Sequence, residues 1–175
     1  MALYNPHFDP AVSTWYRHGN ELLEAMAAID SWTFIVAPHV KLALGRSLDP
    51  SESENIRIDP GSVRSIDISY SNAADVYIGD ASSQVYEFIR DPKPCIFLNL
   101  DRINWRDDAF NAHWRLGQVI VDANQIGPAL ARAAELQPGF EPLQRETLRH
   151  SIDSSPVPAS ERQADAILAF VARSG

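Results

Sequence analysis

The stretch Asp75–Asn99 constrains the fold most, because it holds a complete strand–turn–helix–strand unit. A short apolar run ends at Gly79, and Ser82 and Ser83 follow it as favoured helix N-cap residues. The next apolar residues recur at helical spacing, and Cys95–Leu98 then forms a second apolar run. Such a unit places free backbone N–H groups at the carboxyl end of a strand, where α/β folds hold phosphates.

Strand-like and helix-like segments alternate five or six times along the 175 residues. This alternation predicts an α/β fold, a Rossmann-like parallel sheet with helices on both faces. The length predicts a single domain over residues 1–175, in which 150–158 link to a C-terminal helix. Strands are expected at residues 2–4, 32–37, 55–58, 76–78, 95–98 and 117–121, and helices at 15–29, 85–89, 109–115, 125–135, 139–150 (after Pro138) and 160–173 (with Ile167, Leu168 and Val171 inward).

Composition excludes several classes of function. The formal net charge is −8, and Lys and Arg form no stripe, which argues against nucleic acid or an anionic membrane as the main partner. One cysteine rules out an internal disulfide framework and a cysteine-rich zinc site, and Cys95 is expected to be a buried structural thiol. No apolar run of about 18 residues and no leader pattern occur, which favours a cytoplasmic protein.

Polar side chains follow three of the predicted strands. Asn5-Pro-His7 follows the first, and His39, which could donate to a phosphate oxygen or be merely exposed, follows the second. After the fourth, Ser82 and Ser83 can cap the helix alone or also bind a phosphate. Because parallel strands end at one edge of a sheet, these groups are candidates for a common ligand site.

Two acidic residues have alternative interpretations. Glu87 lies one helical turn beyond Ser83, so it can accept from ribose hydroxyls or be a solvated surface residue. Asp80 can belong to the site or instead fix the turn by bonding backbone N–H groups. The sequence has no G-x-G-x-x-G, Walker loop, Asp-x-Asp pair or zinc-like histidine spacing. We therefore expect no cofactor and no metal.

Four segments in this order resemble the carboxy-terminal half of the CDP-glycerol glycerophosphotransferase family. They are Tyr4-Asn-Pro-His7, Phe34-Ile-Val-Ala-Pro-His39, Ala74-Asp-Val-Tyr-Ile-Gly-Asp-Ala-Ser-Ser83 and Pro92-Lys-Pro-Cys-Ile-Phe97. His39, Asp80, Ser82 and Ser83 match the family's His, Asp and two Ser, Glu87 matches an acidic position, and Ala159-Ser-Glu-Arg162 is similar to the segment before the last helix. Ala81 replaces the usual Tyr, and Asn5-Pro-His7 replaces Pro-Thr-Trp-Arg. The resemblance implies that the acceptor-binding half of the family is not contained in these residues.

The resemblance implies the donor-binding half of a GT-B enzyme that transfers a glycosyl or glycerophosphate group in cell-envelope polysaccharide synthesis. Its donor would be a nucleotide-diphospho compound, CDP-glycerol or a UDP-sugar. It implies that His39 neutralises the diphosphate as the catalytic residue, that Glu87 holds the ribose, that Arg162 adds positive charge, and that His7, Asp80, Ser82 and Ser83 complete the donor site.

It also implies an N-terminal acceptor domain as partner, a cytoplasmic site of action that extends to the membrane face, and little turnover by this chain alone. The main alternative is a non-catalytic GT-B-like module that binds a nucleotide, a sugar or a partner protein. A flavodoxin-like receiver or a dehydrogenase domain fits less well, because its acidic cluster or glycine fingerprint is missing.

Overall fold

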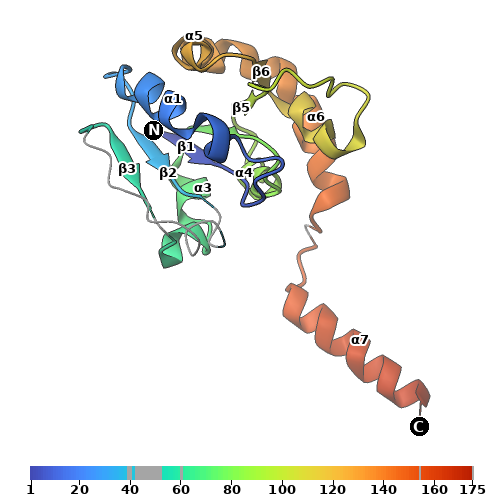
Figure 1. The fold of residues 1–175 in the computed structure, drawn as a ribbon. Coiled ribbons are helices and arrows are strands. Elements are labelled where there is room, and N and C mark those ends of the chain that lie inside the picture. The colour runs from blue at the N-terminus through green and yellow to red at the C-terminus, as the bar shows by residue number, and fades with distance from the viewer. Residues whose placement is uncertain (39–40, 42–52, 60, 154, 175) are drawn as a thin grey trace.

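A six-stranded sheet with helices on both faces forms the centre of the computed structural model, which describes residues 1–38, 41, 53–59, 61–153 and 155–174 (Figure 1). The strand order is β3-β2-β1-β4-β5-β6, and every neighbouring pair is parallel. This confirms the predicted α/β, Rossmann-like class. The strands are β1 (Ala2–Asn5), β2 (Phe34–Val36), β3 (Ile56–Ile58), β4 (Val76–Gly79), β5 (Cys95–Leu98) and β6 (Gln118–Ile120).

Helices cover the sheet on both sides. The α-helices are α1 (Thr14–Ala27), α3 (Ser69–Ala73), α4 (Gln84–Phe88), α5 (Ile126–Ala131), α6 (Ala133–Ser151) and α7 (Ala159–Ser174). The part of the chain that the structure describes also has three 3₁₀ helices, η1 (Val63–Ser65), η2 (Ala109–Leu116) and η3 (Ala123–Gln125).

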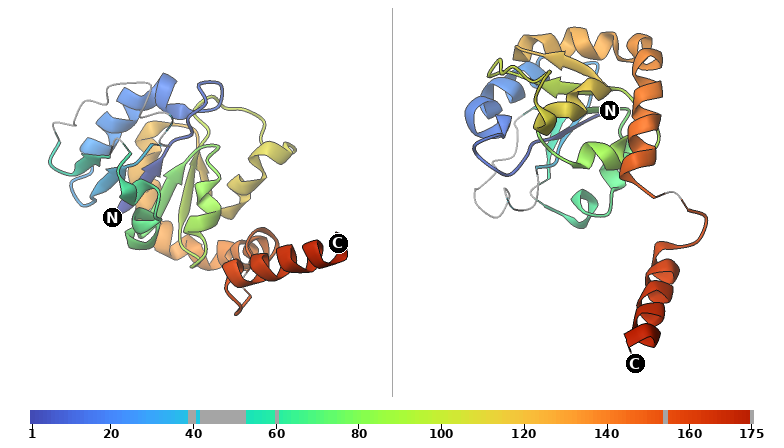
Figure 2. Two further views of the ribbon diagram at one scale, coloured as in Figure 1. Left: turned by 90° about the horizontal axis from the view of Figure 1, so that it is seen from below. Right: turned by 90° about the vertical axis from the view of Figure 1, so that its right-hand side faces the viewer.

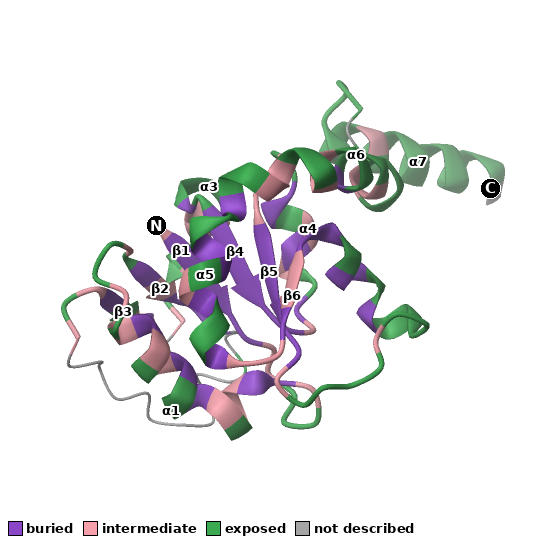
Figure 3. Cartoon of the chain, turned by 90° about the horizontal axis from the view of Figure 1, so that it is seen from above, coloured by how far each residue is buried: buried purple, intermediate pink, exposed green. Residues whose placement is uncertain are grey.

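Successive strand residues contribute to two separate cores, as expected for side chains that alternate between the faces of a sheet. Tyr4 of β1 packs in the cluster that holds Leu22 and Met26 of α1, together with α5. Its neighbour Leu3 packs in the other cluster, with Phe88 of α4 and residues of η2. Figure 3 shows the central strands β1, β4 and β5 buried throughout, which explains their nearly continuous apolar sequences.

The strand order creates a topological switch point between β1 and β4. These adjacent strands pair over their whole length, from Ala2 opposite Val76 to Asn5 opposite Gly79. The chain leaves β1 for α1 on one face and leaves β4 for α4 on the other, as the two clusters show. Open α/β sheets bind ligands where consecutive connections diverge in this way.

The C-terminal region differs from the prediction in two respects. One helix, α6, runs through Pro138 and Pro142 and does not begin after Pro138. Pro138 is exposed, so water can satisfy the carbonyl whose helical bond it removes. The prediction that Ile167, Leu168 and Val171 point inward is also wrong. Helix α7 projects away from the sheet, and these side chains are 55%, 67% and 61% exposed (Figures 1 and 2).

Within the described ranges, no helix is both long and apolar enough to cross a bilayer.

Candidate functional site at the carboxyl edge of the sheet

Asp80, directly after β4, links the β4–α4 connection to the β1–α1 connection at the switch point. Its Oδ1 accepts from the amides of His7 (2.9 Å) and Ala81 (2.7 Å), and its Oδ2 accepts from the amide (2.8 Å) and hydroxyl (2.9 Å) of Thr14. The side chain is almost fully buried, and this desolvation raises the pKa of Asp80 although the hydrogen bonds oppose the shift. Of the two interpretations made for Asp80, the geometry supports the one in which it fixes the turn.

The backbone of Asp80 is held as firmly as its side chain. Its carbonyl accepts from Nε2 of His113 at 2.8 Å and from Nε1 of Trp114 at 2.9 Å, both in η2. Burial lowers the pKa of His113, so the ring is neutral at physiological pH. Sequence reasoning missed both residues, because neither lies near a strand end and only the fold brings η2 to this turn.

Ser82 links the turn to the neighbouring strands. Its hydroxyl donates to Oδ1 of Asn5 at 2.6 Å, and Nδ2 of Asn5 donates to the carbonyl of Ala37 at 2.6 Å. Ser82 Oγ also accepts, at 3.4 Å, from the amide of Gln84 at the start of α4. The hydroxyl is buried and engaged inside the protein, so Ser82 positions the turn, whereas Ser83 is the N-cap residue of α4 and makes no side-chain capping bond.

Ser83 and Glu87 differ from Ser82 in accessibility. Both side chains are exposed; Ser83 is the N-cap residue of α4 and Glu87 lies within that helix. His7 is half-buried, its Nδ1 accepts from the amide of Asp9 at 3.1 Å, and its ring stacks on Phe8. These three predicted donor-site residues follow β1 or β4 in the chain, and solvent reaches the side chain of each.

One predicted residue, Arg162, is not brought to this group, and another, His39, lies outside the described residues. Arg162 is on α7, where it pairs with Asp153 and donates to the carbonyl of Val157 at 3.1 Å. Because α7 projects away from the sheet, Arg162 lies apart from the β4 turn (Figure 1).

Asp59 marks the end of β3 on the same edge. Desolvation raises the pKa of this carboxyl, but hydrogen bonds from the hydroxyls of Ser62 and Tyr70 and from the amides of Ser62 and Gly61 outweigh it and lower the pKa to about 2. The ionised carboxylate therefore anchors the connection between β3 and α3.

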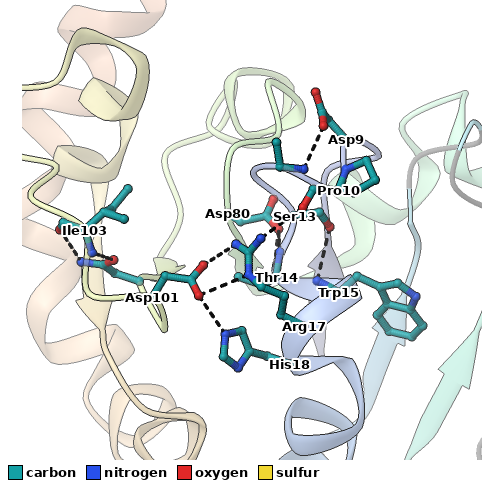
Figure 4. Close-up of polar contacts among 12 residues, drawn as sticks. Asp9, Pro10, Ser13, Thr14, Trp15, Arg17, His18, Asp80, Asp101 and Ile103 are labelled. Atoms are coloured by element: carbon teal, nitrogen blue, oxygen red, sulfur yellow. Dashed lines mark hydrogen bonds and ion pairs between the residues drawn. The ribbon is translucent and has the colours of Figure 1, made fainter.

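A cavity of about 230 Å³ opens beside the Asp80 turn. Ala81 and Thr14 line it, together with the end of β5 and with η2. At its rim, Arg17 donates through Nε (3.2 Å) and Nη2 to the carboxylate of Asp101, which also lies 3.2 Å from Nε2 of His18 (Figure 4). Desolvation raises the pKa of Asp101, yet the bonds from Arg17 and His18 lower it overall, so Asp101 is ionised.

Cys95 takes no part in this site. The thiol is buried in β5, and desolvation raises its pKa far above the range in which a thiolate forms. The expectation of a structural thiol agrees with this geometry.

Comparison with known proteins adds information at the level of the fold. No protein-family model matches the sequence, and no curated protein matches it. Three solved structures of the wall teichoic acid polymerase TagF align with 99% of this chain, with TM-scores of 0.63, 0.65 and 0.64 and sequence identities of 14%, 16% and 16%. The chain has the fold of the part of TagF with which it aligns. It spans 44% of the length of the TagF chain.

The TagF structures are two single-histidine variants and one of these variants after a 15 minute soak with CDPG. TagF is a CDP-glycerol glycerophosphotransferase, so the family resemblance seen in the sequence is confirmed for the fold. The Rossmann-like sheet described above also matches the GT-B architecture of TagF.

Proposed function

We propose that this chain is the donor-binding half of a glycerophosphotransferase or glycosyltransferase that acts in cell-envelope polysaccharide synthesis. The donor would be a nucleotide-diphospho compound, CDP-glycerol or a UDP-sugar. The observation that carries the proposal is the Asp80 turn, which ties the β1 and β4 connections together at the switch point of a TagF-like sheet. A rigid turn at that position is suited to hold an anionic ligand.

The roles proposed for Ser83 and Glu87 follow from their accessibility, and that of His39 follows from the family resemblance. Ser83 would donate to a phosphate oxygen, His39 would neutralise the diphosphate, and Glu87 would accept from the ribose hydroxyls. Asp80 and Ser82 would act through the turn that they fix. Stabilisation of the departing nucleotide by fixed donors and positive charge would be the main catalytic effect. Arg162 has no role in this proposal, because its helix lies apart.

We also propose that this chain acts as one nucleotide-binding domain, cytoplasmic and at the membrane face, beside an N-terminal acceptor-binding domain. The chain spans less than half of TagF, which leaves room in such a protein for a second domain. That domain would supply the acceptor hydroxyl and complete the catalytic cleft.

A thermal-shift panel tests donor binding, with CDP-glycerol, CDP, CMP, a UDP-sugar, UDP and NAD as ligands. A ligand at 100 times its dissociation constant adds about 2.7 kcal/mol of stability. At this chain length that raises the melting temperature by roughly 5–11 °C. We expect a cytidine or uridine diphosphate compound to produce this shift and NAD to produce none.

Variants with matched controls locate the site. His39→Ala and Ser83→Ala should reduce the shift, whereas Ser31→Ala, an exposed serine in the turn before β2, should not. Glu87→Gln should weaken nucleotide binding, and Glu24→Gln on α1 should leave it unchanged. If no nucleotide moves the transition, the proposal is wrong. Tight binding by the full-length protein without transfer would instead favour a non-catalytic module.

A further inference from the structure

The cavity beside the Asp80 turn is not used by the residues assigned so far. It lies between the start of α1 and the β5–η2 connection, and its wall includes Thr14 and Ala81. Thr14 is one of the residues that Asp80 holds, and Ala81 is adjacent to it in the chain. A ligand bound at the switch point could therefore extend directly into this cavity.

The size and charge of the cavity limit what it can hold. At about 230 Å³ it is smaller than the roughly 300–1,000 Å³ pockets that enclose drug-sized ligands, so it suits a small group and not an entire nucleotide. Its charged lining residues are one cation, Arg17, and two carboxylates, Asp101 and Asp108. Because Asp101 already pairs with Arg17, the second carboxylate would repel a phosphate placed inside.

The polar groups in the cavity are mainly acceptors. Asp108 accepts one bond on each oxygen, from the amide of Phe110 (2.9 Å) and from Nδ2 of Asn111 (2.8 Å), and each oxygen retains a further lone pair. Oδ1 of Asn111 accepts nothing from the residues that the structure describes. The acceptor oxygens of Asp108 and Asn111 can therefore bind groups that donate hydrogen bonds, such as hydroxyls.

The apolar part of the lining is exposed at the mouth. Phe110 is 58% and Ile103 44% exposed, although both are large apolar side chains that line the same cavity. Carbon atoms of a ligand would cover them and remove this apolar surface from water. Acceptors inside and apolar side chains at the mouth fit a compact group that carries both C–H surface and hydroxyls.

We propose that this cavity is the subsite for the uncharged polyhydroxyl end of the donor, the glycerol or sugar beyond the diphosphate. Hydroxyls of this group donate to Asp108 and Asn111, and its carbon atoms pack on Phe110. This inference rests on the proposed function. It assigns the selectivity for the transferred group to η2, whereas the nucleotide is bound at the β4 turn.

Isothermal titration calorimetry of the 175-residue chain with matched ligand pairs tests the subsite. CDP-glycerol is compared with CDP, and a UDP-sugar with UDP, because each pair differs only in the group beyond the diphosphate. Phe110→Ala should weaken the binding of the complete donor about fivefold to tenfold and leave CDP or UDP unchanged. Asn111→Ala should act in the same direction. Phe170→Ala removes the same kind of side chain from exposed α7 and should change neither.

The outcomes separate the two proposals. Equal weakening of both ligands of a pair would place the nucleotide in the cavity, and no weakening of either would show that the cavity is not a subsite. Each result overturns the inference while nucleotide binding itself stands. If the unmodified chain binds none of the four ligands, the proposed function fails and the subsite fails with it. Phe110 is largely exposed, so its variant should fold, which circular dichroism checks.

Discussion

Replacing Asp80 by Asn should destabilise the protein by about 2 kcal/mol. The carboxylate presents two acceptor oxygens to four donors, which come from His7, Ala81 and Thr14. A carboxamide of the same shape has one oxygen and one NH₂ group, so either orientation directs an N–H at another N–H. The better orientation keeps the oxygen toward His7 and Ala81 and leaves the amide of Thr14 without an acceptor.

The magnitude follows from that single unpaired donor. A buried donor without a partner costs about 1–3 kcal/mol, and Thr14 is only 3% exposed. Removal of the charge partly offsets this loss, because the burial that raises the pKa of Asp80 also makes its ionised form unfavourable. A loss of about 2 kcal/mol corresponds to a fall in melting temperature of roughly 4–8 °C at this length.

Urea denaturation measures the loss, and amide hydrogen exchange locates it. The amide of Thr14 should exchange faster in the variant, while that of Phe34, which donates to Asn55 across the sheet at 2.8 Å, should keep its protection. Asp9→Asn, in the exposed part of the same loop, is the control and should change stability by less than about 0.5 kcal/mol. A loss below that limit for Asp80→Asn, with unchanged exchange at Thr14, would refute the assignment of Asp80 as the link between the two loops.

Two further predictions concern stability. Because the pKa of Asp59 is lowered from 3.8 to about 2, its stabilising contribution of about 2 kcal/mol is present above pH 4 and is lost as the pH falls towards 2. Denaturation curves at pH 7, 4 and 2 should show this loss of stability in the parent protein and not in Asp59→Asn. If the Asp59 carboxyl titrates near pH 3.8 by NMR, this prediction is wrong. Gly117→Ala would place its Cβ 2.2 Å from the carbonyl oxygen of Cys95, so thermal denaturation should show a loss of stability of about 3 kcal/mol or more. The control is Gly127→Ala, whose Cβ would lie 3.6 Å from a side-chain carbon of Ile29 and which should be tolerated. Equal losses of stability in both variants would show that the close approach to Cys95 is not the cause.

Local sequence determined the elements and their class. Apolar runs such as Cys95–Leu98 are long enough for a strand and too short for a helix, and turn residues bound them, so alternation along the chain was sufficient to predict a parallel sheet. The turn at Asp80 was also visible in the sequence, because aspartate is favoured in turns, where its side chain accepts from nearby backbone amides such as that of Ala81.

The tertiary structure decided which groups meet. Ser82 and Ser83 are adjacent and chemically identical, yet one is buried against Asn5 and the other faces solvent, because the turn points only one of them at β1. His113 and Trp114 reach the carbonyl of Asp80 from more than 30 residues away, through the packing of η2 on the sheet. Periodicity predicts which residues of a helix share a face, but it does not say whether another surface lies opposite. The apolar residues of α7 are therefore exposed, although their spacing is that of a buried stripe.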